Sequence, residues 1–362
     1  MAMSNPRKFA TGKVITLEQY CRLLHSPMLA EEHSVVSACP YLAVELDSGT
    51  KVAHPPTRAT AWRPTTVVIG FASQPTTTLP APIQELLPLF DMIADTTLPA
   101  HLIDGALYNI DSQPMASAAL VQLLRQGDNM SVEHALQMES LTYSTLQHGA
   151  EFEAWLSQQG TKDSAMRISQ SADINDTYAA EQPVVLCHRN DAQHLEVTLN
   201  RPAKHNALSA AMRDELHTAL LLAEADASIE RVILAGSGSS FCAGGDLDEF
   251  GLARDAAQAH LTRTTRSPAL LIHSIRHRVS AQLHGACIGA GIEMTAFATQ
   301  VVATPEAFFA LPEVGFGLVP GAGGTVSVPR RIGRHLAAAL ALSGQRIDAP
   351  TALDWGLIDA IA

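Results

Sequence analysis

Several features are missing from this chain of 362 residues, and each absence excludes a class of protein. The 24 basic residues are outnumbered by 36 acidic ones and form no stripe, which argues against a nucleic-acid partner. The N-terminus lacks the apolar core of a signal peptide. The most apolar window, 279–298, is interrupted by Gln282, His284 and Glu293, so it is not a credible membrane span. We therefore expect a protein of the reducing cytoplasm with no membrane partner.

Cysteines are also few, and they are widely scattered. The sequence has five of them and no CxxC pair, which indicates neither a disulfide framework nor a zinc site. We expect buried free thiols and no bound metal. Apolar residues make up 47% of the chain and charged residues 17%, which fits a soluble globular protein and excludes a disordered one. The length allows one large domain or two ordinary ones.

The chain divides at residues 161–182, which are polar, carry no apolar period and are predicted to form a linker. In the half that follows, 183–362, strand patterns alternate with helical ones, which predicts an α/β fold. Ser209 is a good N-cap for the first helix, and Pro268 is expected to break a later one. The expected strands are 184–187, 195–199, 231–235, 279–283, 300–303 and 308–310. The expected later helices are 261–275, one from about 291, 326–330, 334–343 and 349–355.

The preceding half, 1–160, gives a weaker pattern. Short strands are expected at 41–46 and 66–71, with loops rich in proline and threonine at 50–64 and 73–82. From Ala116 the pattern is helical, and one run recurs at helical spacing through Val132, Leu136, Glu139, Tyr143 and Leu146. We predict no catalytic constellation before residue 160.

Two glutamates in glycine-rich surroundings are the strongest chemical signal. Glu293 follows a glycine run, and Glu313 stands in a second glycine-rich segment. Three small-residue segments, 239–247, 284–293 and 321–325, each open a predicted helix. Small residues let a ligand approach the backbone, and helix N-termini offer unpaired N–H groups with partial positive charge. The pattern predicts an oxyanion hole beside an acid/base pair, which is what chemistry on an activated acyl group requires.

These segments closely resemble the crotonase (enoyl-CoA hydratase/isomerase) superfamily. The similar motifs lie at 199–208, 241–247, 285–293, 311–325, 339–349 and 352–359. The resemblance covers about 183–362 without a large gap. It implies a crotonase-like spiral of ββα units and an acyl-CoA substrate, with coenzyme A as part of that substrate and no separate cofactor.

The resemblance also implies roles for particular residues. Glu293 is expected to activate a water and Glu313 to protonate C2 of the substrate. The backbone N–H groups of Ala243 and Ala290 would polarise the thioester carbonyl, and Gly321 N–H would orient the water. The family usually has glycine where this chain has Ala290. Contacts to the substrate and its CoA part are expected from Lys204, Ala207, Ala243, Gly244, Gly245, Asp246 and Leu311.

Both glutamates together favour an enoyl-CoA hydratase, a lyase of fatty acid metabolism, because hydration needs one group for the water and another for the proton. Another crotonase reaction, such as isomerisation, thioester hydrolysis or decarboxylation, is an alternative. A non-catalytic acyl-CoA-binding or scaffold protein is a second one. Carboxylates more than about 8 Å apart, or facing different cavities, would contradict the hydratase hypothesis.

In this family the core is normally followed by helices that complete the pocket, whereas this sequence stops at Ala362. Residues 114–156 look like that missing segment. We therefore expect 1–160 to be a truncated, non-catalytic crotonase-like unit, whose helical part, 114–156, caps the core of its own chain or of a neighbouring one. An unrelated helical domain is the alternative. The family likeness implies a homo-oligomer, a trimer or a hexamer.

Overall fold

The computed structural model describes residues 12–47, 63–127, 129–159, 183–190 and 193–362. The predicted linker, 161–182, and most of the predicted loop at 50–64 lie outside these residues. Within the described residues, no helix is long and apolar enough to cross a membrane. All five cysteines are free thiols, as expected, but Cys187 is exposed rather than buried.

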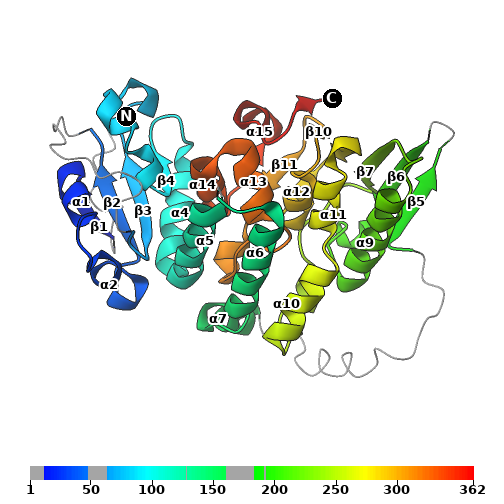
Figure 1. The fold of residues 1–362 in the computed structure, drawn as a ribbon, viewed down its shortest axis with the longest axis horizontal. Helices are drawn as coiled ribbons and strands as arrows, with labels where there is room; N and C mark the ends of the chain where they lie inside the picture. The colour runs from blue at the N-terminus through cyan, green and yellow to red at the C-terminus, as the bar shows by residue number, and fades with distance from the viewer. Residues whose placement is uncertain (1–11, 48–62, 128, 160–182, 191–192) are drawn as a thin grey trace.

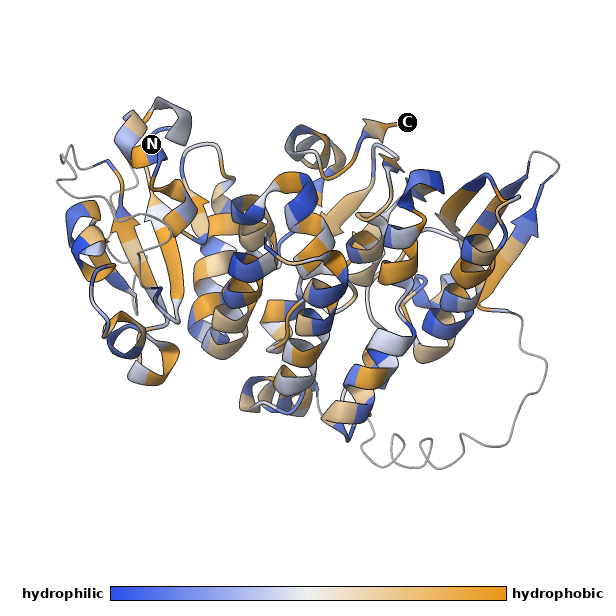
Figure 2. Ribbon diagram, in the orientation of Figure 1, coloured by the Kyte–Doolittle hydropathy of each residue, from blue (hydrophilic) through white to orange (hydrophobic). Residues whose placement is uncertain are grey.

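A four-stranded parallel sheet forms from the first hundred residues, in the order β1-β2-β3-β4. Its strands are β1 (Lys13–Thr16), β2 (Tyr41–Glu45), β3 (Val67–Phe71) and β4 (Met92–Ala94). Four consecutive residues at the start of β2 and of β3 are buried, because a parallel sheet is covered on both faces. Figure 2 shows these strands as hydrophobic along most of their length.

The two faces of this sheet are covered by different helices. Leu42, Val44 and Val68 belong to a core shared with the short helices α1 (Leu17–Leu23), α2 (Leu29–Glu32) and α3 (Ala81–Gln84). Alternate strand residues such as Ala43 and Ile69 point the other way and join the main core of the molecule. The N-terminal sheet is therefore packed against the rest of the chain rather than held apart from it.

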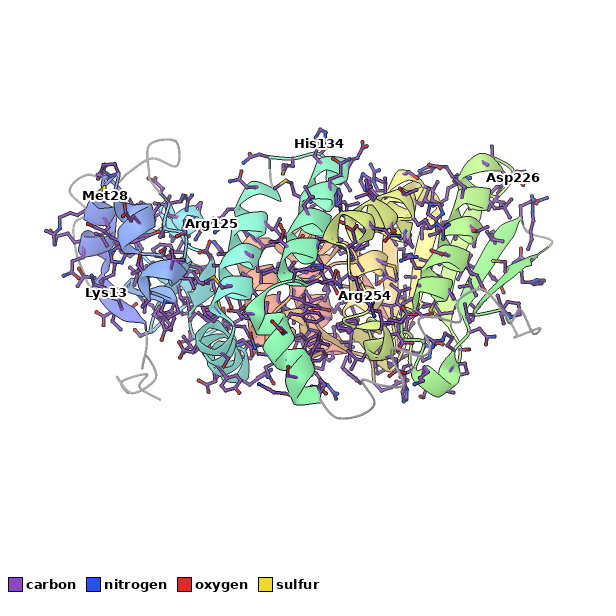
Figure 3. All side chains as sticks on the ribbon, turned by 90° about the horizontal axis from the view of Figure 1, so that it is seen from below. Lys13, Met28, Arg125, His134, Asp226 and Arg254 are labelled. Carbon is purple, nitrogen blue, oxygen red and sulfur yellow. The ribbon has the colours of Figure 1, made fainter. Side chains whose placement is uncertain are left out.

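Four helices follow the sheet: α4 (Ala100–Ser112), α5 (Pro114–Gly127), α6 (Val132–Leu146) and α7 (Ala150–Gln159). We call them the helical segment. Ser131 caps α6 by accepting a hydrogen bond from His134 N–H. Arg125 on α5 ties the segment to the N-terminal sheet, because its guanidinium pairs with buried Asp91 at 2.6 Å and donates to the Thr66 carbonyl at 2.8 Å. Figure 3 labels Arg125 at this boundary.

The C-terminal part is built on a six-stranded sheet and a small three-stranded one. The first has the order β13-β10-β8-β7-β6-β5 and is parallel except for the β5–β6 hairpin; the second has the order β12-β11-β9. The strands are β5 (Val185–Arg189), β6 (His194–Leu199), β7 (Arg231–Gly236), β8 (Val279–Leu283), β9 (Ala286–Ile288), β10 (Gln300–Ala303), β11 (Phe308–Ala310), β12 (Ile347–Asp348) and β13 (Ala360–Ile361). The helices are α9 (Ala210–Ala225), α10 (Ala256–Thr265), α11 (Pro268–Ser274), α12 (Ala290–Thr295), α13 (Gly324–Ile332), α14 (Arg334–Ser343) and α15 (Ala349–Trp355).

The predicted α/β architecture of 183–362 is confirmed. Ser209 caps α9 by accepting from Met212 N–H, and the helix expected over 261–275 is divided in two immediately before Pro268, which becomes the first residue of α11. The strands at 279–283, 300–303 and 308–310 begin and end where predicted. In the first half, the two predicted strands are present as β2 and β3. The elements β1, β4 and α4 were not predicted.

The helical segment packs on the C-terminal part of the same chain. Helix α4 contacts α14, α5 and α6 both contact α13, and α6 also contacts α10. Figure 1 shows the consequence: β1–β3 lie at one end of an elongated molecule, β5–β7 at the other, and α4–α6 lie with α13 and α14 between them.

Candidate active site

A cavity of about 310 Å³ lies between α6 and the C-terminal part of the chain. Its walls come from α6, from α9 to α12, from the segment 245–250 and from the loop 321–323. Both predicted catalytic glutamates, Glu293 and Glu313, line it. Two elements far apart in the sequence therefore enclose one space, and one of them belongs to the helical segment.

Glu293 is fixed by the loop that precedes α13. It lies on the first turn of α12 and is 1% exposed. Its Oε2 accepts hydrogen bonds from Ala322 N–H at 2.7 Å and from Gly324 N–H at 2.9 Å. Burial raises the pKa of Glu293 to about 7, and the two N–H donors oppose that rise because they stabilise the carboxylate.

Glu313 is buried with fewer donors, of which its own backbone N–H is one. It begins a 3₁₀ turn, Glu313–Phe316, and is 8% exposed. Among the residues that the structure describes, its Oε2 has no hydrogen-bond partner. Burial and, after it, the negative charge of Glu293 raise the pKa of Glu313 well above its ordinary value.

The two carboxylates face one point. A Cβ atom at Gly289 would collide with Glu313 Oε1 and stand 3.6 Å from Glu293 Oε1. The two oxygens therefore lie within about 6 Å of each other, a separation at which like charges keep one group protonated. The difference in hydrogen bonding decides which group that is: Glu293 holds the charge and Glu313 holds the proton.

The two expected oxyanion donors differ in their present partners. Ala290 is the first residue of α12, and an N–H group in the first turn of a helix has no acceptor inside the helix. Ala290 also lines the cavity. The N–H of Ala243 instead donates to the His205 carbonyl at 3.0 Å. A substrate carbonyl could use Ala243 only after this bond is broken.

The other predicted contacts are spread over a wider area. Gly321, Gly245 and Asp246 line the cavity. Asp246 is 6% exposed and is paired with Arg201 at 2.8 Å, so its carboxylate serves the loop itself. Lys204 is exposed and pairs with Asp248 at 2.8 Å.

Five of the seven predicted contacts do not line the cavity: Lys204, Ala207, Ala243, Gly244 and Leu311. Gly244 accepts from Leu208 N–H at 2.8 Å through its carbonyl, and the Ala207 carbonyl accepts from the Arg201 side chain at 2.7 Å. Leu311 is 1% exposed within the core.

Sequence reasoning missed two residues of the site, both on α6. Glu139 is 2% exposed and lines the cavity, and Tyr143 places its ring directly over Gly321. Arg263 from α10 stacks on the other part of that ring, 4.8 Å from its centroid. The signal was present in the helical pattern, because a glutamate standing on an otherwise apolar stripe must find a partner inside the protein.

Cations also line the cavity, although the chain as a whole is acidic. They are Arg213, Arg263 and Arg266, from α9, α10 and the residues between α10 and α11. Arg213 and Arg266 both pair with Asp214. Such a cluster offsets the overall negative charge where an anionic ligand would enter.

Comparison with known proteins decides the family. Residues 190–362 match the family model described as Enoyl-CoA hydratase/isomerase. The chain is 36% identical over 167 residues to the 2,3-dehydroadipyl-CoA hydratase of Escherichia coli, covering 46% of this chain and 65% of that protein. The C-terminal part of the chain, residues 190–362, belongs to the crotonase superfamily.

Two further similarities were found. The mevalonyl-coenzyme A hydratase SIDH of Beauveria bassiana is 34% identical over 175 residues, which are 46% of this chain and 62% of that protein. A crystal structure of an enoyl-CoA hydratase from Mycobacterium smegmatis is 33% identical, with a TM-score of 0.47 over 50% of this chain and 70% of that one. The chain thus spans less than two thirds of the curated crotonase relatives named here.

A metal site is not apparent in the described part of the chain, where no group of three or more histidine, cysteine, aspartate or glutamate side chains could hold an ion.

Proposed function

We propose that this crotonase is an enoyl-CoA hydratase, which adds water across the C2=C3 bond of a 2-enoyl-CoA thioester. The observation that carries the proposal is the unequal pair of glutamates in one cavity. Glu293 accepts two N–H bonds and favours the charged form, whereas buried Glu313 has no partner for Oε2 among the described residues and favours the protonated form.

The charged form of Glu293 and the protonated form of Glu313 suit the two proton transfers of the reaction. The Glu293 carboxylate takes a proton from water as the water oxygen bonds to C3, and the electron pair of the double bond moves to the thioester oxygen as an enolate. Glu313 then gives its proton to C2. The proton gained by Glu293 returns to Glu313 across the short gap between them, so the pair ends as it began.

Main-chain N–H groups stabilise the enolate oxygen in this proposal. Ala290 N–H is placed for this at the start of α12, and each such donor contributes on the order of 3 kcal/mol to the transition state. Ala243 N–H becomes the second donor when it leaves the His205 carbonyl. The arginines that line the cavity, above all Arg213 and Arg266 on its exposed side, supply the positive charge for the CoA phosphates.

The test is loss of crotonyl-CoA absorbance with wild type, Glu293→Gln and Glu313→Gln. Each variant should lose at least about a hundredfold in kcat, because each removes one of two proton transfers. Glu153→Gln, a change on the exposed face of α7, is the matched control and should keep wild-type turnover. Undiminished turnover in either site variant would defeat the assigned roles.

A second candidate, an acyl-CoA-binding protein without turnover, is favoured by one observation. The Ala243 N–H is occupied by His205, so only one of the two expected donors is free to meet a thioester oxygen. Calorimetry separates the candidates: tight acyl-CoA binding without turnover over a broad panel of enoyl-CoA thioesters supports the binding protein. An isomerase would instead move the double bond of a 3-enoyl-CoA and leave crotonyl-CoA unchanged.

A further inference from the structure

Four consecutive N–H groups, two in the loop before α13 and two in its first residues, are divided between two carboxylates. Ala322 and Gly324 donate to Glu293, as described above. Gly323 N–H donates to Glu139 Oε1 at 2.7 Å, and Thr325 N–H donates to Glu139 Oε2 at 2.9 Å. The Thr325 hydroxyl adds a third bond to Glu139 Oε2 at 2.6 Å. The loop is thus held from one side by α12 and from the other by α6.

We infer that Glu139 is a positioning residue of the active site, whose carboxylate fixes the loop 321–325 so that its other two amides hold Glu293 toward the cavity. The four donors are consecutive residues that bond alternately to the two carboxylates, so the two sets of bonds depend on one backbone geometry. Releasing Gly323 and Thr325 lets the loop turn, and that turn moves Ala322 and Gly324 away from Glu293.

Burying a third carboxylate here is costly, which indicates that its position has a purpose. A carboxyl group taken out of water is tolerated only with partners, and Glu139 has three donors. Burial, followed by the charge of Glu293, nevertheless raises the pKa of Glu139 to about 8. A neutral apolar residue at this point of α6 would pack without that cost but could not accept from the loop.

The charged groups around Glu139 come from each element packed on it. Glu293 on α12 acts on it as a like charge, Glu313 lies nearby on its 3₁₀ turn, Tyr143 lies one turn along α6, and Arg263 on α10 is the nearby cation. Arg330 on α13 is directed elsewhere, to the carbonyls of Gly127 and Met130. A measured pKa of Glu293 therefore reflects the charges of all these groups.

Two variants distinguish the effect of the length of the Glu139 side chain from the effect of its charge. Glu139→Asp keeps the charge but shortens the side chain by one methylene, so it cannot bond Gly323 and Thr325 together. Glu139→Gln keeps the length of the side chain but loses the charge. Its amide oxygen can still accept both bonds from Thr325, whereas its NH2 group cannot accept the bond from Gly323 N–H. A positioning role therefore predicts that Glu139→Asp lowers kcat more than Glu139→Gln does. A purely electrostatic role predicts the reverse order.

The first readout is kcat and KM with crotonyl-CoA, and it rests on the proposed function as an enoyl-CoA hydratase. In Glu139→Asp, kcat should fall by about tenfold or more with KM within about threefold of wild type, while Glu139→Gln should stay within about threefold in both. Glu153→Gln is the control. If Asp keeps wild-type kcat, or if Gln loses more than Asp, the inference is wrong. If Asp does not fold, near-normal kcat in Gln supports the inference and a tenfold loss in Gln overturns it.

Carboxyl NMR titration of glutamates labelled with carbon-13 gives a readout that needs no turnover. Loss of the Ala322 and Gly324 donors should move the Glu293 midpoint to higher pH in Glu139→Asp, because the carboxylate loses what stabilises it. An unchanged midpoint in folded protein would show that Glu139 serves stability alone. If wild type hydrates no enoyl-CoA, the proposed function fails while this titration still decides the role of Glu139.

Discussion

Gly289 and Glu313 stand so close that no side chain fits between them. Gly289 is the residue before α12, its φ is 49°, and a Cβ atom there would strike Glu313 Oε1. Glycine is therefore required at this position for two reasons. Other residues rarely adopt this backbone conformation, and Glu313 occupies the space that a side chain would need. The same residue begins the helix that carries Ala290 and Glu293.

Gly289→Ala should accordingly damage activity more than stability. The new methyl group pushes Glu313 out of the cavity and strains the start of α12, so we expect kcat to fall by at least about a hundredfold and the free energy of unfolding by about 1–3 kcal/mol. Gly333→Ala is the matched control for backbone strain, because Gly333 also has a positive φ of 78° but nothing stands within 4 Å of its Cβ position. Equal loss of kcat in both variants would show that strain, not the collision with Glu313, is responsible.

Stability should fall as pH rises across the range in which the buried glutamates ionise. Glu293 and Glu139 have pKa values raised from 4.5 to about 7 and about 8, so the folded chain binds more protons than the unfolded chain between these values. Their contribution is fully present below pH about 4.5 and is lost as pH rises through the folded values, at about 1.4 kcal/mol per pH unit for each extra proton.

Thermal melts at a series of pH values between 5 and 8 measure how the melting temperature depends on pH. Glu313→Gln removes one carboxyl whose pKa is raised, so its melting temperature should depend less on pH than that of wild type. Four histidines with lowered pKa values, among them His335, act in the opposite direction below their ordinary pKa of 6.5. A wild-type melting temperature that rises from pH 6.5 to 8 would therefore contradict the raised pKa values.

The strands and helices of 183–362 could be predicted because their local signals agree with the fold. Ser209 is a good cap, Pro268 breaks a helix, and the strand residues are apolar where the sheet is buried. The two glutamates that we propose to be catalytic were equally visible, since each stands in a glycine-rich motif. In the N-terminal part β1 and β4 are four and three residues long, which is too short for a period to show.

Glu139 was missed for a different reason. Its partners, Gly323 and Thr325, lie almost two hundred residues along the chain, and nothing local tells an accepting carboxylate from a solvated one. The same holds for the occupied N–H of Ala243, whose acceptor is a carbonyl in another loop. Backbone hydrogen bonds between loops depend on tertiary structure and leave no mark on residue type.

The ion pair between Arg125 and Asp91 should be worth more to stability than an exposed pair. The Arg125 side chain is 9% exposed and that of Asp91 is 2% exposed. Asp91 also accepts from Val68 N–H at 2.8 Å. Arg125→Ala leaves this carboxylate buried without its cation and should lower the free energy of unfolding by about 3–5 kcal/mol.

The control for that pair is Arg22→Ala, which breaks the exposed pair with Glu18 on α1. It should cost less than about 0.5 kcal/mol. Denaturant unfolding measures both. Equal effects would mean that Arg125 does not anchor the helical segment to the N-terminal sheet.

An aromatic cluster closes the cavity behind Phe250. Trp155 on α7 packs on Phe316 with ring centroids 4.8 Å apart, and it also lies 6.0 Å from Phe250, which lines the cavity. Trp155→Ala removes the support behind Phe250 and leaves space for that ring to retreat. We therefore expect kcat/KM for octenoyl-CoA to rise relative to crotonyl-CoA, because a longer acyl chain can occupy the space released.

Trp62 cannot serve as the comparison, since it lies outside the described residues, but Trp355 can. It lies on α15, away from the residues that line the cavity. Trp355→Ala should lower stability without changing the ratio of the two substrates. If Trp155→Ala leaves that ratio unchanged while the protein stays folded, the cluster formed with Phe250 and Phe316 does not limit the acyl chain, and the chain must extend toward another wall of the cavity.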